Sequence, residues 1–298
     1  MGEYEEAAKL IRKNNPFVSV CARVCVRKCE NVCRRGIYDE AVAINDIKRY
    51  IADYPQIYEV FEEQAPATNK KVAIIGAGPS GLTAAYYLGL LGHEVHIYEA
   101  LEQAGGMLRY GIPEYRLPKE ILDKEINYIL KVSKAKLYLN TKIPQDIPFQ
   151  TLKQNYDAIY IATGAFGSNT MRIPNENNTK GVILGVDFLK DKAINPTPIT
   201  GTVVVVGGGN TAMDAARVAV RLGAKQVIIL YRRTKAQMPA DPLEIKGCED
   251  EGVQIIELAA PIEIIPTTDG YIKSLKCIRM KLGEPDSSGR RSPTPIEN

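Results

Sequence analysis

The sequence of 298 residues contains no tryptophan and only two histidines, His93 and His96, which lie close together. This scarcity argues against zinc sites built on histidine and against Ser-His-Asp catalysis. No apolar run reaches the roughly 18 residues that a membrane-spanning helix needs. The N-terminal segment MGEYEEAAKLIRK has acidic residues where a secretory signal peptide is basic. We therefore expect a cytoplasmic protein with no membrane partner.

The charge balance is also close to neutral. Lysine and arginine total 38 against 35 aspartate and glutamate, for a net charge of +3. So small an excess gives no reason to expect nucleic acid as a partner. The composition, with 45% hydrophobic and 24% charged residues, is that of an ordinary globular protein. The length corresponds to about two domains of roughly 150 residues each.

Four of the six cysteines recur at every fourth position near the N-terminus. They are Cys21, Cys25, Cys29 and Cys33. Disulfides are rare in a reducing cytosol, so this spacing indicates an iron–sulfur cluster. On a continuous helix, the four sulfurs would share one broad face. A zinc site and a buried stripe of cysteines are the alternatives.

Basic residues are interspersed among these cysteines. Positive charge lowers thiol pKa values and offsets the negative charge of a thiolate-ligated cluster. The basic residues of the segment are Arg23, Arg27, Lys28, Arg34 and Arg35, against the single acid Glu30.

The rest of the chain alternates between strand and helix patterns. Before it, helices are expected over 3–13 and over 39–62, the second broken near Pro55. One strand–helix–strand pattern covers 71–75, 80–91 and 94–98, and a second covers 202–206, 211–222 and 226–231. A buried strand is expected at 156–162, a hairpin at 262–266 and 271–281, and a loop after it. Two such strand–helix–strand openings predict two nucleotide-binding domains.

The first glycine loop is Gly76-Ala-Gly78-Pro-Ser-Gly81, directly between a strand and a helix. Its first glycine permits the tight turn, its second lets the backbone approach a pyrophosphate, and its third lets helix and strand pack closely. The N-terminus of the helix supplies free N–H groups. Glu99 ends the next strand, where a carboxylate binds the hydroxyls of the adenosine ribose.

The second glycine loop is Gly207-Gly208-Gly209-Asn210-Thr211-Ala212, in which alanine replaces the third glycine. No acid follows the second strand of this unit. Instead Arg232 and Arg233 stand there, and guanidinium groups pair with a 2′-phosphate that a carboxylate would repel. This favours NADP(H) over NAD(H); a solvated surface pair is the alternative.

Two dinucleotide sites in one chain are best explained by hydride transfer between them. A flavin is the natural partner for a nicotinamide, because it accepts a hydride and releases electrons singly. Iron–sulfur clusters accept single electrons, so the cysteine segment is the expected exit. That transfer depends on positioning and water exclusion, and no catalytic acid, base or nucleophile is predicted.

Several longer motifs occur together in a fixed order. The first loop continues to the pair Gly105-Gly106 and to Met107-Leu-Arg-Tyr-Gly-Ile-Pro-Glu-Tyr-Arg-Leu-Pro118. Ala162-Thr-Gly-Ala165 and Gly208-Gly-Asn-Thr-Ala-Met-Asp214 follow, and NPFVSVCARVCVRKCENVC precedes them all. Together these motifs resemble the small (β) subunit family of NADPH-dependent glutamate synthase. Its relatives include the N-terminal half of dihydropyrimidine dehydrogenase and the flavoprotein subunits of some transhydrogenases.

The resemblance implies an α/β fold in which two Rossmann-like domains of the disulfide-reductase type follow a helical, cysteine-rich iron–sulfur domain. The implied boundaries are 1–69 for the iron–sulfur domain, 70–198 for the FAD domain and 199–298 for the NADP domain. Its implied cofactors are FAD, NADP(H) and a [4Fe–4S] cluster. Electrons would leave for a larger oxidoreductase subunit, such as the glutamate synthase large subunit.

The resemblance also implies the site residues. The FAD residues are Gly76, Gly78, Pro79, Ser80, Gly81, Glu99, Gly105, Gly106, Arg109, Thr163 and Gly164. The NADP residues that it implies are Gly208, Gly209, Asn210 and Thr211, to which the charge argument above adds Arg232 and Arg233. The cluster ligands are Cys21, Cys25, Cys29 and Cys33.

The sequence departs from the family pattern at both ends. It contains no second, upstream cysteine group, and it ends before the late Gly-Asp motif and the helix that faces the flavin. We therefore expect a fragment or half of a split subunit, with weakened flavin binding. A non-catalytic electron-transfer or assembly subunit without FAD is the second hypothesis, and a zinc-binding module that senses NADP is the third.

Overall fold

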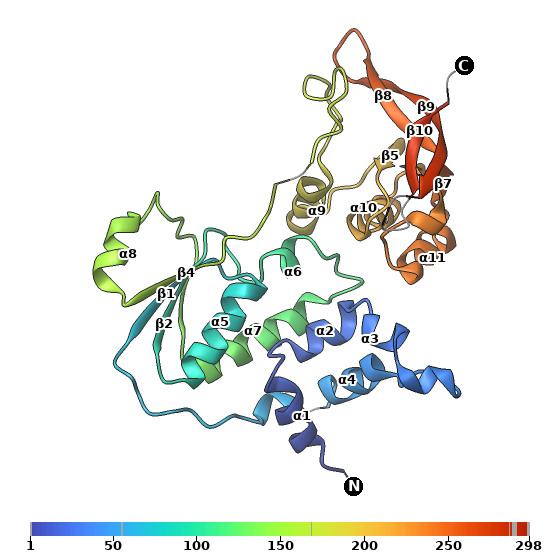
Figure 1. The fold of residues 1–298 in the computed structure, drawn as a ribbon. Helices are drawn as coiled ribbons and strands as arrows, with labels where there is room; N and C mark the ends of the chain where they lie inside the picture. Colours follow the sequence, from blue (N-terminus) through green and yellow to red (C-terminus); the bar gives the residue numbers. More distant parts are fainter. Residues whose placement is uncertain (1, 55, 168, 286, 288–290, 297–298) are drawn as a thin grey trace. The chain divides into compact units, whose positions relative to one another are not determined.

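The computed structural model describes residues 2–54, 56–167, 169–285, 287 and 291–296 (Figure 1). The chain divides into two compact units, Met1–Ala165 and Phe166–Asn298. Because the structure does not test the finer division into three domains, that division stays a prediction.

Short helices make up the N-terminal part of the first unit. They are α1 (Tyr4–Arg12), α2 (Val18–Val24), α3 (Lys28–Asn31), η1 (Arg34–Ile37), α4 (Ile44–Ala52) and η2 (Ile57–Glu59). The helix expected over 3–13 is confirmed as α1. The helix expected over 39–62 is reduced to α4 and η2, and the residue at its expected break, Pro55, lies outside the described residues.

The cysteine segment is not one continuous helix. Its first helix ends at Val24, and Cys25 is extended, with φ −68° and ψ 133°. Arg27 has left-handed backbone angles, with φ 54°, so the chain turns before α3 begins. Cys33 is extended again, with φ −66° and ψ 123°. The expectation that all four sulfurs share one helix face is therefore wrong, because two breaks separate the cysteines.

A parallel sheet forms the rest of the first unit. Its strands are β1 (Lys71–Ile75), β2 (Glu94–Tyr98), β3 (Lys136–Tyr138) and β4 (Ala158–Ile161), in the order β3-β2-β1-β4. The helices after β1 are α5 (Pro79–Leu90), α6 (Met107–Tyr110), α7 (Lys119–Ser133) and α8 (Phe149–Asn155). The first strand–helix–strand prediction is confirmed to within one residue.

Side chains alternate between the two faces of this sheet. Val72 and Ile74 pack in the core with α5 and α7, whereas Ala73 and Ile75 pack with Leu152 of α8. Figure 1 shows α8 on the opposite side of the sheet from α5 and α7. Because β4 lies at an edge of the sheet, 62% of Ile161 is exposed. The strand expected over 156–162 is confirmed as β4, but the expectation that it is buried is wrong.

The second unit contains the second strand–helix–strand pattern and two sheets. One is a parallel sheet, β5-β6-β7, and the other is an antiparallel sheet, β10-β9-β8. Its elements are α9 (Gly185–Ile194), β5 (Thr202–Val206), α10 (Asn210–Arg221), β6 (Gln226–Tyr231), η3 (Lys235–Gln237), α11 (Pro242–Asp250), β7 (Gln254–Glu257), β8 (Ala259–Pro266), β9 (Ile272–Pro285) and β10 (Arg291–Pro295).

The C-terminal hairpin is confirmed and extends further than expected. Strands β8 and β9 pair antiparallel from Ala259 opposite Arg279 to Pro266 opposite Ile272. The tail expected as a loop is instead partly strand, because β10 pairs with β9. Within the part of the chain that the structure describes, no helix is both long and apolar enough to cross a membrane.

Candidate functional site

The first glycine loop joins β1 to α5 at the carboxyl end of the parallel sheet. Gly76 has φ +107°, and a Cβ added there would lie 2.3 Å from the Ala162 carbonyl oxygen. A Cβ on Gly81 would lie 2.0 Å from the Gly76 carbonyl oxygen. Both positions therefore require glycine, one for the turn and its approach to the end of β4, the other for the approach of helix to loop.

The Gly105-Gly106 turn sits directly on this loop. The Gly105 N–H donates to the Ala77 carbonyl over 2.8 Å. A Cβ on Gly106, whose φ is +52°, would lie 2.8 Å from the Gly78 Cα, so the two backbones touch. In contrast, a Cβ on Gly78 would meet only the Gly106 Cα, at 3.8 Å. The loop thus leaves room beside Gly78 for a pyrophosphate.

The first turn of α5 is open to solvent next to that space. Pro79 occupies its first position, and both Pro79 and Ser80 are exposed. The Ser80 hydroxyl lies 2.9 Å from the Tyr160 hydroxyl on β4. An exposed helix N-terminus offers N–H groups and partial positive charge to an anion. The geometry therefore fits the diphosphate of a dinucleotide.

Glu99 is the acid at the end of β2, and it is 7% exposed. One carboxylate oxygen accepts the Ala77 N–H over 2.7 Å, and the other accepts the Leu101 N–H over 2.9 Å. Each oxygen of a carboxylate can accept more than one hydrogen bond, so ribose hydroxyls can be accepted as well. Glu99 therefore fixes the glycine loop in addition to its predicted role towards ribose.

The remaining predicted FAD residues divide into two groups. Arg109 is 8% exposed; its Nε donates to the Ala104 carbonyl over 2.5 Å, and its guanidinium pairs with Asp123. The positive charge of Arg109 is thus paired with a carboxylate of the protein. Thr163 and Gly164 are exposed beyond β4, and the Thr163 nitrogen lies 3.4 Å from a Cβ built on Gly76. The structure therefore brings Thr163 to the first glycine loop.

The second glycine loop joins β5 to α10 in the same way. Gly207 has φ +145° and donates to the Leu230 carbonyl over 3.0 Å. A Cβ on Gly208 would lie 2.6 Å from the Tyr231 ring. A Cβ on Gly209, the residue before α10, would meet no atom within 4 Å. This open side of the loop fits a second pyrophosphate.

The two residues after Gly209 have different surroundings. The Asn210 side-chain oxygen accepts the Asp241 N–H over 2.8 Å, so it ties the loop to the start of α11. Thr211 is exposed in the first turn of α10.

The two arginines after β6 differ from each other. Arg232 is exposed. Arg233 is only 7% exposed, and its Nε donates to the Arg291 carbonyl over 2.9 Å. Arg233 thus stabilises the contact with β10, and the case for a 2′-phosphate contact depends mainly on Arg232.

The four cysteines have unlike surroundings. Cys21 is half-buried 3.5 Å from the Asn15 side-chain oxygen, and burial raises the pKa of its thiol. Hydrogen bonding from the Val42 backbone lowers the pKa of the Cys33 thiol, and the Arg35 backbone adds to this effect. Cys25 accepts the Arg27 N–H over 3.4 Å, and Cys29 is exposed.

The four cysteines have the donor chemistry that an iron–sulfur cluster requires. Thiolates are the usual ligands of such clusters. Yet among the described residues, no group of three or more histidine, cysteine, aspartate or glutamate side chains is arranged to hold a metal ion.

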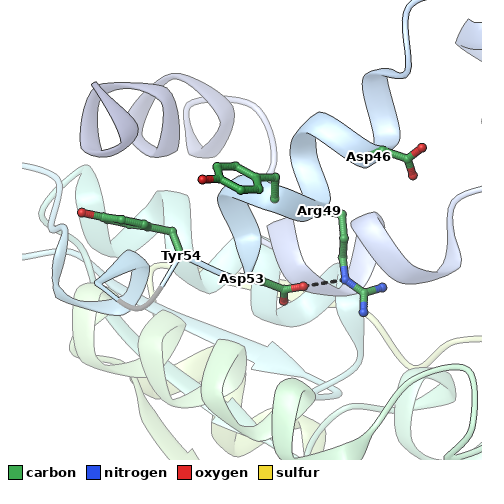
Figure 2. A pocket seen from close by; sticks show the side chains of 5 residues that line it. Asp46, Arg49, Asp53 and Tyr54 are labelled. Carbon is green, nitrogen blue, oxygen red and sulfur yellow. Dashed lines mark hydrogen bonds and ion pairs between the residues drawn. The ribbon is translucent and has the colours of Figure 1, made fainter. Parts of the chain in front are cut away.

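A surface pocket beside this segment contains paired charges. It is lined by Asp46, Arg49, Tyr50, Asp53 and Tyr54, from α4 and the turn after it (Figure 2). Figure 2 shows the Arg49–Asp53 ion pair, 2.7 Å long. Asp53 also pairs with Arg23 over 2.5 Å. These side chains hold the helices together, and none of the predicted site residues lines the pocket.

Sequence reasoning missed two residues of α7 that hold other segments in place. The Glu125 carboxylate accepts two N–H groups of α2. Lys119 Nζ donates to the carbonyls of Leu108, Ile112 and Leu117, which holds the loop after Gly106. For Glu125 a signal existed, because it interrupts the apolar stripe of α7.

Two family models match the chain. Pyridine nucleotide-disulphide oxidoreductase matches residues 70–286. Dihydropyrimidine dehydrogenase domain II, 4Fe–4S cluster, matches residues 1–60. The chain therefore belongs to the pyridine nucleotide-disulphide oxidoreductase family and begins with a region like that 4Fe–4S domain. The predicted fold class, with Rossmann-like domains after a cysteine-rich helical region, is confirmed.

Named relatives share most of this chain. It is 45% identical to the NADP(+)-dependent formate dehydrogenase subunit beta of Moorella thermoacetica, over 99% of this chain and 45% of that protein. It is 32% identical to the putative glutamate synthase [NADPH] small chain of Cereibacter sphaeroides, over 96% of this chain and 72% of that protein. The predicted resemblance to the glutamate synthase small-subunit family is confirmed.

The fold also matches a solved structure. Mycobacterium tuberculosis FprA in complex with NADPH has a TM-score of 0.66 and 20% identity, over 78% of this chain and 68% of that one. At that identity the match shows the fold alone. The chain spans less than half the length of the first curated relatives, 44–48% of each.

Proposed function

We propose that this chain oxidises NADPH, passes the hydride to FAD, and delivers single electrons through a [4Fe–4S] cluster to a larger partner oxidoreductase. One observation carries the proposal. The chain builds two separate glycine loops, each at the carboxyl end of a parallel strand and the start of a helix, and follows one with Glu99 and the other with Arg232. The family and the named relatives support it.

The first loop fits FAD. Gly76, Gly78 and Gly81 shape the backbone around the diphosphate, and the exposed first turn of α5 offers the backbone N–H of Ser80, since Pro79 at the first position has none. Glu99 would hold the ribose while it fixes the loop. Bound FAD supplies the chemistry that accepts a hydride and releases electrons one at a time. The role of the chain is to hold and orient it, with Thr163 and Gly164 bordering the loop.

The second loop fits NADPH. Gly208 and Gly209 shape the backbone there, and Thr211 extends the exposed first turn of α10. A 2′-phosphate forms charge-assisted hydrogen bonds with a guanidinium group, and Arg232 is placed for this after β6. This arrangement favours NADPH over NADH.

The iron–sulfur region is proposed as the electron exit. Cys21, Cys25, Cys29 and Cys33 are the proposed ligands, and the match of residues 1–60 to a 4Fe–4S domain supports them. Several relatives are named as subunits, so the acceptor is proposed to lie on a larger oxidoreductase subunit. A glutamate synthase large subunit is the finer form of this proposal. We also propose a cytoplasmic location.

The decisive experiment is an anaerobic titration of the purified protein with FAD and then NADPH. We expect a flavin absorption band near about 450 nm that NADPH bleaches. Failure to bind FAD would instead favour a non-catalytic electron-transfer or assembly subunit. Elemental analysis separates iron from zinc, and zinc without iron would favour a module that senses NADP.

A further inference from the structure

The helix that carries the first cysteine is held by a side chain from α7. The two oxygens of the Glu125 carboxylate accept the N–H groups of Ser19 and Val20, over 2.7 and 2.9 Å. Both N–H groups lie in α2, immediately before Cys21. The contact therefore fixes the first turn of the cysteine segment to a helix more than a hundred residues later in the chain.

The Glu125 carboxylate is buried, and it accepts hydrogen bonds that no other side chain of the described residues accepts. Glu125 is 2% exposed, and Ser19 is 1% exposed. Phe17, which precedes α2, provides no side-chain cap. The Ser19 hydroxyl is engaged elsewhere, 2.8 Å from the Tyr58 hydroxyl. Glu125 therefore satisfies two buried backbone donors that would otherwise lose their partner.

Helix α7 is in turn packed closely on α5. A Cβ added to Gly89 in α5 would lie 2.4 Å from the Ser133 Cα in α7, so the two helices touch through their backbones. Helix α5 starts at Pro79, in the first glycine loop. Close contacts thus connect the first glycine loop, through α5 and α7, to Glu125. The hydrogen bonds of Glu125 then connect α7 to the turn of α2 that precedes Cys21.

We propose that Glu125 is a positioning residue for electron transfer out of the flavin site, because it sets where the cysteine segment lies relative to the first glycine loop. The proposal rests on the proposed function. Rates of transfer between centres depend steeply on their separation, so a loosened α2 would slow the outward step. Binding of FAD and hydride uptake from NADPH use other residues and would not change.

The test compares Glu125→Gln with Glu120→Gln in the full protein loaded with FAD and iron–sulfur. Glutamine keeps the volume but offers one oxygen, so one buried N–H loses its acceptor. Glu120 lies exposed on the same helix and serves as the control. We expect amide hydrogen exchange at Ser19 and Val20 to rise about tenfold or more in Glu125→Gln alone.

The second readout separates positioning from general stability. In anaerobic stopped-flow, bleaching of the flavin by NADPH should stay within about twofold of wild type, while reduction of the cluster slows about tenfold or more. Unchanged exchange and unchanged cluster reduction in Glu125→Gln would overturn the proposal. Equal slowing of both steps would also overturn it, since that outcome marks a purely structural residue.

A further variant covers the case in which Glu125→Gln does not fold. Glu125→Asp keeps the charge and is one methylene shorter, so it should show the same split between the two steps. Wild-type behaviour of Glu125→Asp would refute the assignment. If the wild-type protein itself fails to bind FAD, the proposed function fails, while the exchange measurement still tests the anchoring role of Glu125.

Discussion

Replacement of Glu99 by glutamine should weaken FAD binding strongly. In the structure the two carboxylate oxygens accept the N–H groups of Ala77 and Leu101, and the side chain is buried. A glutamine amide accepts one of these and turns its own NH2 group towards the other donor. The unsatisfied donor destabilises the free and the bound protein alike, whereas the loss of a charge-assisted hydrogen bond from the proposed ribose contact, about 1.5–3 kcal/mol, falls on the bound state alone. Since 1.4 kcal/mol is about a factor of ten, we expect FAD affinity to fall about 10- to 100-fold.

The assay is a fluorescence titration of the apoprotein with FAD. Glu102→Gln is the matched control, because Glu102 is exposed on the loop that follows Glu99. Circular dichroism spectra and unfolding curves of both variants show whether the fold is kept. If Glu99→Gln keeps its fold and binds FAD within about twofold of wild type, the reasoning on Glu99 is wrong.

Three further predictions concern other residues. Gly208→Ala places a Cβ 2.6 Å from a packed aromatic ring, so KM for NADPH should rise while FAD binding measured by fluorescence stays constant. Arg232→Ala should reduce the preference for NADPH over NADH about tenfold or more in steady-state kinetics, and an unchanged preference would refute a 2′-phosphate contact. Burial lowers the pKa of His96, and Glu94 opposes this shift. The neutral form of His96 therefore stabilises the folded protein above about pH 6.5, and this stabilisation is lost as the pH falls through the pKa that His96 has in the folded protein. His96→Gln should therefore lose less unfolding free energy than wild type on acidification, and an equal loss in both proteins would refute the role of His96.

The strands that flank the two glycine loops, and the loops themselves, were predictable because their signals are local. The apolar run at Lys71–Ile75 and the glycines after it fix strand, turn and helix start within a few residues. At Gly76 and Gly81 the structure leaves no room for a Cβ, which agrees with the roles deduced from the spacing alone. The same holds for the second loop, whose strand bounds are those expected.

The cysteine segment was not predictable because its backbone breaks depend on the surrounding helices. Spacing alone suggests one helix through Cys21, Cys25, Cys29 and Cys33. In the structure the Glu30 side chain accepts the Asn45 N–H over 2.7 Å, which ties α3 to the start of α4. Such a tie between separate helices follows from tertiary packing, which a periodicity argument does not include.

The contact partners of charged side chains were equally unpredictable from the sequence. A sequence shows that Arg109 and Arg233 lie near cofactor motifs, and it does not show what their guanidinium groups contact. In the structure the first pairs with Asp123 and the second donates to a carbonyl of β10. A buried charge is costly unless it is paired, so these arginines are committed to protein partners, whereas Arg232 is not buried.

Helix α7 explains why the cysteine region and the first dinucleotide region form one compact unit. Besides Glu125, it carries Tyr128, whose ring lies 3.8 Å below the buried Arg12 guanidinium of α1. Arg12 also donates to the Val60 carbonyl over 3.0 Å. A buried cation and a buried carboxylate both depend on this one helix for their surroundings. Removing the N-terminal helices would therefore leave α7 with polar groups that no longer have partners, so the cysteine region is an integral part of the unit that holds the first glycine loop.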